Sequence, residues 1–211
     1  MPKGVEVVFS DDYIKKVEIM RFLKPVLLVS ALTLLAPVSQ AQVFSVFLNG
    51  PSEAPPNPSL GVGTGFVVFN TAAHTMFIQV SFSGLTGTTT ASHIHAPTAV
   101  AGVGNAGVAT ETPTFGGFPL GVTSGSYTNT YDMTLLASYN GAFITANGGT
   151  AASAETALVA AAVAGKSYLN IHTNLSPGGE IRGFLLSAPE PGTGILALIG
   201  LGALIYRRKR S

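Results

Sequence analysis

Three of the four histidines in this 211-residue chain stand in short apolar contexts that are typical of β-strands. His93 and His95 flank Ile94, and His172 follows a leucine, an asparagine and an isoleucine. Side chains two residues apart in a strand share a face, so His93 and His95 project together. If their strand lies beside that of His172, three imidazoles converge, a ligand set suited to copper or zinc. The sequence therefore offers a candidate metal site at His93, His95 and His172.

The same histidines also have a simpler interpretation. Each imidazole could donate to a backbone carbonyl or to Glu180, and so hold the loops around it in place. The sequence identifies no carboxylate that would orient the imidazoles toward a metal, so both interpretations stay open. The fourth histidine, His74, stands alone in a predicted turn and is expected to be solvated.

Two further sets of polar residues are candidates for structural or binding roles. In the segment 177–183, a proline-glycine turn leads into a strand that places Glu180 and Arg182 on one face. A partly buried pair there would fix strand register; alternatively, Glu180 orients His172. Glu53 lies in an acidic, proline-rich loop that is either a rigid connector or a recognition element.

The elements that position these residues are predicted to be strands. Apolar and polar residues alternate from 75 to 82, and Asn70 opens a turn sequence before them, so 61–83 is predicted to be a hairpin. The other predicted strands are 43–49, 92–95, 106–110, 126–136, 167–173 and 180–186.

Such strands, separated by clusters of glycine, proline, serine and threonine, predict an all-β fold, an antiparallel Greek-key β-sandwich. One short crossover helix is expected at 151–164, capped by Thr150 or Ser153 and ended by Gly165. Long loops are expected at 50–64 and 96–124.

The first 41 residues are predicted to be an N-terminal extension and signal peptide. Cations precede an apolar stretch at 26–36, and Ser39-Gln40-Ala41 supplies the small residues that signal peptidase requires before its cut. The first nineteen residues lack this pattern, so Met20 is a candidate for the true translation start. Cleavage is expected after Ala41.

The last 23 residues, 189–211, are predicted to be a sorting tail. Pro189-Glu190-Pro191 marks the end of the folded body, an apolar run at 194–206 follows, and Arg207-Arg208-Lys209-Arg210 closes the chain. Four cations hold such a C-terminal hydrophobic helix with its end on the cytoplasmic side of a membrane. The tail resembles the PEP-CTERM sorting signal, which implies transient anchoring in the inner membrane and processing by an exosortase-type peptidase.

Composition limits what the remaining domain, 42–188, can do. It holds five acidic and two basic residues, a formal charge of −3, so it lacks the clustered cations that nucleic-acid binding needs. The chain has no cysteine, which excludes disulfides and thiolate chemistry. Nucleic acid is therefore excluded as a partner, and no cofactor is expected beyond the candidate copper or zinc ion.

A set of short motifs in this domain resembles the CHRD domain, a module named from chordin. The matching residues are Leu48-Asn49-Gly50, Glu53, Pro55-Pro56, Gly65, His93-Ile94-His95, Gly165, Tyr168-Leu169-Asn170-Ile171-His172-Thr173 and Pro177-Gly178-Gly179-Glu180-Ile181-Arg182-Gly183. The resemblance implies an all-β extracellular module with no established catalytic activity.

These observations lead to two functional expectations. The first is an exported, non-enzymatic protein sorted to the cell surface or extracellular matrix, where it binds protein or polysaccharide. The alternative is a copper- or zinc-binding protein, because the His-Ile-His strand and the later Gly-Glu-Ile-Arg-Gly segment also resemble parts of the Cu/Zn superoxide dismutase sandwich.

The two terminal signals predict the ends of the mature protein. Material recovered outside the cell should begin at Gln42 and should have lost the tail near Pro189-Glu190-Pro191, which an intact-mass measurement checks. A permanently anchored protein would instead keep Arg210, and that result, like recovery of the chain from cytosol, would contradict the sorting hypothesis.

Overall fold

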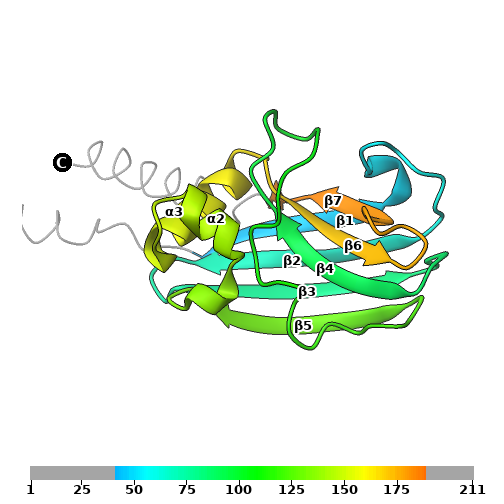
Figure 1. The fold of residues 1–211 in the computed structure, drawn as a ribbon, viewed down its shortest axis with the longest axis horizontal. Helices are drawn as coiled ribbons and strands as arrows, with labels where there is room; N and C mark the ends of the chain where they lie inside the picture. Colours follow the sequence, from blue (N-terminus) through cyan, green and yellow to red (C-terminus); the bar gives the residue numbers. More distant parts are fainter. Residues whose placement is uncertain (1–40, 189–211) are drawn as a thin grey trace, which may run out of the picture. The chain divides into compact units, whose positions relative to one another are not determined.

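The computed structural model describes residues 41–188, which form an antiparallel β-protein with a few short helices (Figure 1). Its strands are β1 Gln42–Asn49, β2 Val62–Asn70, β3 Thr75–Ser83, β4 Thr89–His95, β5 Gly125–Asp132, β6 Tyr168–Thr173, β7 Ile181–Phe184 and β8 Leu186–Ser187. Its helices are the α-helices α2 Gly141–Ala146 and α3 Ala151–Val163 and the 3₁₀-helices η2 Gly50–Ser52 and η3 Leu136–Ser138.

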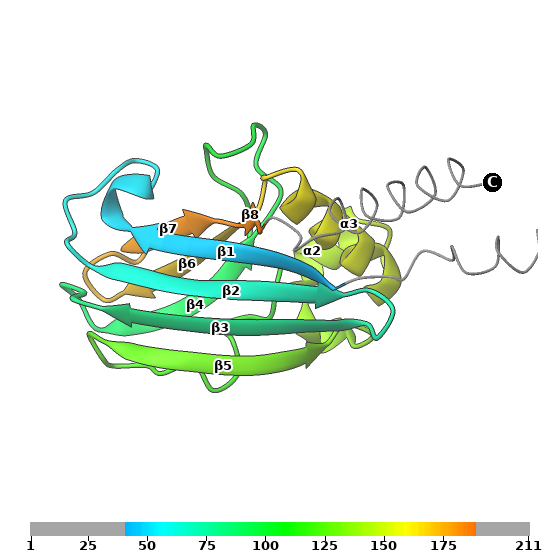
Figure 2. The ribbon, with the colours of Figure 1, turned by 180° about the vertical axis from the view of Figure 1, so that it is seen from behind.

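The strands form one hydrogen-bonded sheet in the order β4-β6-β7-β1-β2-β3-β5, with β8 paired to β1. The sheet curls, so that β4, β6 and β7 form one layer in front of β1, β2, β3 and β5 (Figures 1 and 2). Asn49 of β1 pairs with Arg182 of β7 where the two layers join. The all-β antiparallel prediction is confirmed, but the sandwich-like layers belong to one continuous sheet.

The core lies between the two layers, as the alternation of residues in β3 predicted. Met76, Ile78 and Val80 point inward and are buried, and Ile94 of β4 and Leu169 of β6 meet them from the other layer with no exposed surface. Burial of these side chains is the main driving force for the fold in a chain without disulfides. The opposite face of β4, β6 and β7 is left for polar residues.

Some predicted elements differ from the observed ones. The segment 106–110 is not a strand, because it crosses the end of β4 and pairs only through isolated bridges, such as that between His95 and Val108. The strand predicted to reach residue 136 ends at Asp132, whose carboxylate accepts a hydrogen bond from the backbone N–H of Thr134 and turns the chain.

The predicted helix is present as α3, and Thr150 is its cap, with Ser153 returning the hydrogen bond. Gly165 follows its end in the left-handed conformation, at φ 66°. A second helix, α2, was not predicted; it is only six residues long and is capped by the side chain of Asn140.

The predicted signal peptide and C-terminal hydrophobic helix fall in 1–40 and 189–211, outside the described residues. In the part of the chain that the structure describes, neither α-helix has the length and apolar character needed to cross a membrane.

Candidate functional site

Pairing of β4 with β6 brings the three candidate histidines together. In the register of these antiparallel strands, His95 is opposite Tyr168, His93 is opposite Asn170, and His172 is opposite Ala91. Paired residues share a face, so all three imidazoles lie on the side of the layer that faces away from the core. The condition on which their convergence depended, that the two strands are neighbours, is met.

This face of the sheet is covered rather than open to solvent. The long loop between β4 and β5 passes over it, and the exposed fraction is 6% for His93 and 8% for His95, with His172 partly exposed. The loop stays in place because its residues between 104 and 113 hydrogen-bond to this face.

The three rings contact one another closely. Ring centroids are 5.8 Å apart for His93 and His95, 5.2 Å for His93 and His172, and 5.7 Å for His95 and His172. One ring nitrogen from each histidine lies within 4.8 Å of those of the other two. The rings thus form a single cluster rather than three separate loop anchors.

Each imidazole is also fixed by a hydrogen bond to a backbone carbonyl. The bonds are His93 Nε2 to Pro113 (2.6 Å), His95 Nδ1 to Ala106 (2.9 Å) and His172 Nδ1 to Pro177 (2.9 Å). Because a carbonyl oxygen only accepts, each bonded nitrogen carries the proton, which fixes the tautomer of the neutral ring.

The other nitrogen of each ring then bears a free lone pair. His93 Nδ1, His95 Nε2 and His172 Nε2 are buried and have no hydrogen-bond partner among the described residues. A buried acceptor left without a partner costs about 1–3 kcal/mol. Three unpartnered ring nitrogens in one cluster resemble the ligand set of a metal site without its ion.

The electrostatics of the cluster keep the imidazoles neutral. Burial lowers the pKa of His93 and of His172, and it lowers the pKa of His95 to about 4. The neighbouring His172 and the guanidinium of Arg182 add to the effect at His95. Neutral imidazole is the form that ligates metals, so the protonation state of the cluster at neutral pH is compatible with metal binding.

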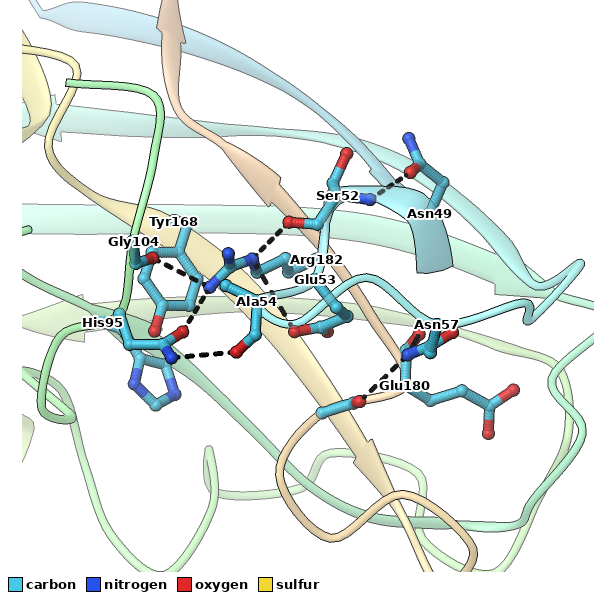
Figure 3. Close-up of polar contacts among 12 residues, drawn as sticks. Asn49, Ser52, Glu53, Ala54, Asn57, His95, Gly104, Tyr168, Glu180 and Arg182 are labelled. Carbon is cyan, nitrogen blue, oxygen red and sulfur yellow. Dashed lines mark hydrogen bonds and ion pairs between the residues drawn. The ribbon is translucent and has the colours of Figure 1, made fainter. Parts of the chain in front are cut away.

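Arg182 of β7 connects the cluster to two loops (Figure 3). Its side chain is 2% exposed, and Nε donates to the carbonyl of Ser52 (2.5 Å), while Nη1 donates to the carbonyl of Gly104 (3.1 Å) and to Asn105 Oδ1 (2.8 Å). Asn105 Nδ2 donates in turn to the carbonyl of Ala54 (2.9 Å). One guanidinium therefore ties both loops to the sheet.

Arg182 reaches the histidines through Tyr168. The guanidinium lies 4.6 Å from the Tyr168 ring centroid, and that ring stacks on His95 at 4.9 Å with 6° between the planes. The Tyr168 hydroxyl accepts a hydrogen bond from the backbone N–H of Ala106, whose carbonyl holds His95. This stack positions His95, and sequence analysis missed it, although Tyr168 shares a strand face with His172.

Glu53 supplies the negative charge opposite Arg182, at 3.7 Å between Oε2 and Nε. Burial raises its pKa to about 7, against the lowering effects of Arg182 and of Asn170. Gly179, at φ 128°, makes room here, because a Cβ would lie 2.7 Å from Glu53 Oε1 and 2.6 Å from the Asn170 amide. The glycine in the turn before β7 thus leaves space for the buried side chains of Glu53 and Asn170.

Glu180 has neither of its predicted partners. Its carboxylate accepts hydrogen bonds from the Ser59 hydroxyl (2.7 Å), the Thr173 hydroxyl (2.7 Å) and the backbone N–H groups of Thr86 and Gly87. The predicted pair with Arg182 and the predicted orientation of His172 are both wrong. Glu180 precedes β7, and its side chain points away from Arg182. Its carboxylate therefore links the loops that contain Ser59 and Thr86.

His74 also differs from expectation. Its Nδ1 lies 2.7 Å from Glu155 Oε2 of α3, although half of its side chain is exposed. It does not belong to the three-histidine cluster and provides a natural control for it.

Comparison with known proteins assigns the family. The family model for the CHRD domain matches residues 44–185, and the chain belongs to this family. The PEP-CTERM protein-sorting motif matches residues 187–210, so both sequence resemblances are confirmed. The motif implies export by way of transient membrane association, with processing by exosortase-type machinery. Searches of curated proteins and of solved structures each found no significant match.

Two buried groups should give the metal-free protein opposing pH dependences. The pKa of His95 falls from 6.5 to about 4 on folding, so its contribution to stability is complete above pH 6.5 and is lost as the pH falls toward 4. The pKa of Glu53 rises from 4.5 to about 7, so its contribution is present below pH 4.5 and is lost as the pH rises toward 7.

Glu53→Gln should therefore expose the histidine effect. In metal-free protein carrying this change, the free energy of unfolding measured with urea should rise by about 3 kcal/mol between pH 4 and 6.5 from His95 alone. The unsubstituted protein should show a flatter profile. A flat profile in Glu53→Gln itself would contradict the assigned burial of the imidazoles.

Proposed function

We propose that this exported CHRD protein is a non-enzymatic metal-binding module of the cell surface or extracellular matrix, with one copper or zinc ion bound by His93, His95 and His172. The observation that carries the proposal is the set of three buried ring nitrogens without hydrogen-bond partners, grouped in one cluster of neutral imidazoles.

The loop-holding interpretation of the histidines is compatible with this proposal. Each imidazole does donate to a carbonyl, but those bonds use only one nitrogen of each ring. In metal sites, a ligating histidine commonly gives its second N–H to a carbonyl or carboxylate, which sets ring orientation and tautomer. The carbonyls of Pro113, Ala106 and Pro177 are suited to that role.

The spacing of the nitrogens requires only a small closure around an ion. Metal–nitrogen bonds of about 2.0–2.1 Å imply that ligand nitrogens lie roughly 3.5 Å apart. The ring nitrogens, which lie within 4.8 Å of one another, would therefore have to approach by about 1 Å on binding.

A dismutase-like activity is not favoured by the same residues. Such an enzyme needs a fourth histidine on copper and a neighbouring zinc site that includes a carboxylate. Among the described residues, His74 pairs with Glu155, Glu111 accepts from Tyr131, and Asp132 bonds to a turn. The candidate ligand group in this part of the chain consists of the three histidines, so we propose binding rather than catalysis.

Protein or polysaccharide binding is the second candidate function. The face of β1, β2, β3 and β5 that points away from the core is rich in serine and threonine, and Phe47 is 57% exposed on it. Asp132 is the charged residue of this face, which suits a neutral partner such as a polysaccharide.

Metal analysis distinguishes the two candidates. Protein purified without a histidine tag and stripped with a chelator should take up one copper or zinc ion per chain. Its melting temperature should rise, because a free metal concentration of 100 times the dissociation constant adds about 2.7 kcal/mol to the free energy of unfolding. His93→Ala, His95→Ala and His172→Ala should each abolish uptake.

The matched control is His74→Ala, which removes a histidine outside the cluster and should leave uptake intact. Metal-free protein with an unchanged melting temperature after addition of copper and zinc would reject the metal role. Polysaccharide or protein binding would then be the function to pursue.

A further inference from the structure

We infer that the three-histidine centre selects copper(I), a monovalent ion, over divalent ions such as zinc. This inference rests on the proposed metal-binding function and adds the charge and identity of the ion. It draws on the charges around the cluster and on the number of ligands that the chain offers.

The ligands bring no negative charge to the ion. All three are neutral imidazoles, and the described residues place no carboxylate in the ligating group. The desolvation cost of a buried ion grows with the square of its charge, so a divalent ion costs about four times as much as a monovalent ion. Histidine is a suitable ligand for copper as well as for zinc, so ligand type does not decide between them.

The nearest buried cation makes a divalent ion less favourable still. Arg182 lies over the ring of Tyr168, at 4.6 Å from its centroid, and that ring stacks on His95. The field of Arg182 therefore disfavours positive charge at the ligands. Glu53 offsets this field incompletely, because burial raises its pKa to about 7 and leaves it partly protonated at neutral pH.

The number of ligands points the same way. Zinc in proteins takes four ligands, all from the protein in structural sites and three from the protein plus a water in catalytic sites, whereas copper(I) is stable with two or three nitrogen ligands. The cluster offers three, and its free nitrogens are buried beneath the loop that Arg182 holds. The three histidines are thus a complete ligand set for copper(I), whereas zinc would also need a water to enter this buried space as its fourth ligand.

The direct test compares two dissociation constants in the unmodified, metal-free protein. Copper(I) is titrated without oxygen, with ascorbate as reductant and bicinchoninate as competing ligand, and zinc(II) is titrated against a chelating dye. We expect copper(I) to bind at least 100-fold more tightly. Equal or tighter zinc binding would overturn this inference and leave the proposed function standing, whereas failure of both ions to bind would overturn both.

A charge variant tests the electrostatic cause. Glu53→Gln keeps the side-chain shape but leaves Arg182 without its counter-charge. Coulomb energy is proportional to ion charge, so the rise in log Kd should be about twice as large for zinc(II) as for copper(I). Asp132→Asn, at the exposed end of β5 and outside the covering loop, is the matched control and should change neither constant.

Equal shifts for the two ions, or no shift, would contradict the electrostatic explanation. The ratio of the two constants in the unmodified protein tests the selectivity itself even where the variant fails to fold.

Discussion

The burial of Arg182 is the constraint on which the rest of the site depends. A guanidinium that is 2% exposed must find acceptors and a counter-charge, and it finds them in Ser52, Gly104, Asn105 and Glu53. Meeting this need brings two loops over the outer face of β4, β6 and β7. The same loops cover the histidines, so the desolvation of the imidazoles follows from the way that one cation is accommodated.

The curled sheet gives each of its layers two different faces. Inside, Ile94 and Leu169 join the apolar core, while the alternate residues of the same strands carry the polar cluster. The long loop between β4 and β5 supplies carbonyls to His93 and His95, which explains its glycine- and proline-rich sequence as a close-fitting cover. In a CHRD domain marked for export, the result is a covered cluster of three neutral imidazoles, each bonded to a backbone carbonyl.

Alternation of residues predicted the strands, the inward set of β3 and the shared face of His93 and His95, because these depend on local geometry alone. The partners of Glu180 and Arg182 were predicted wrongly, since most of their contacts join segments more than 70 residues apart, such as Arg182 and Asn105. The stacking of Tyr168 on His95 was missed for the same reason: it requires the strand register, which sequence patterns do not specify.

The central claim is that three imidazoles form one coordination sphere. X-ray absorption spectroscopy of the metal-loaded protein tests it most directly, because scattering from imidazole rings around the ion is distinctive. The account predicts three imidazole nitrogens at about 2.0 Å from the metal. A first shell made of oxygen ligands, or a spectrum unchanged by His95→Ala, would contradict it.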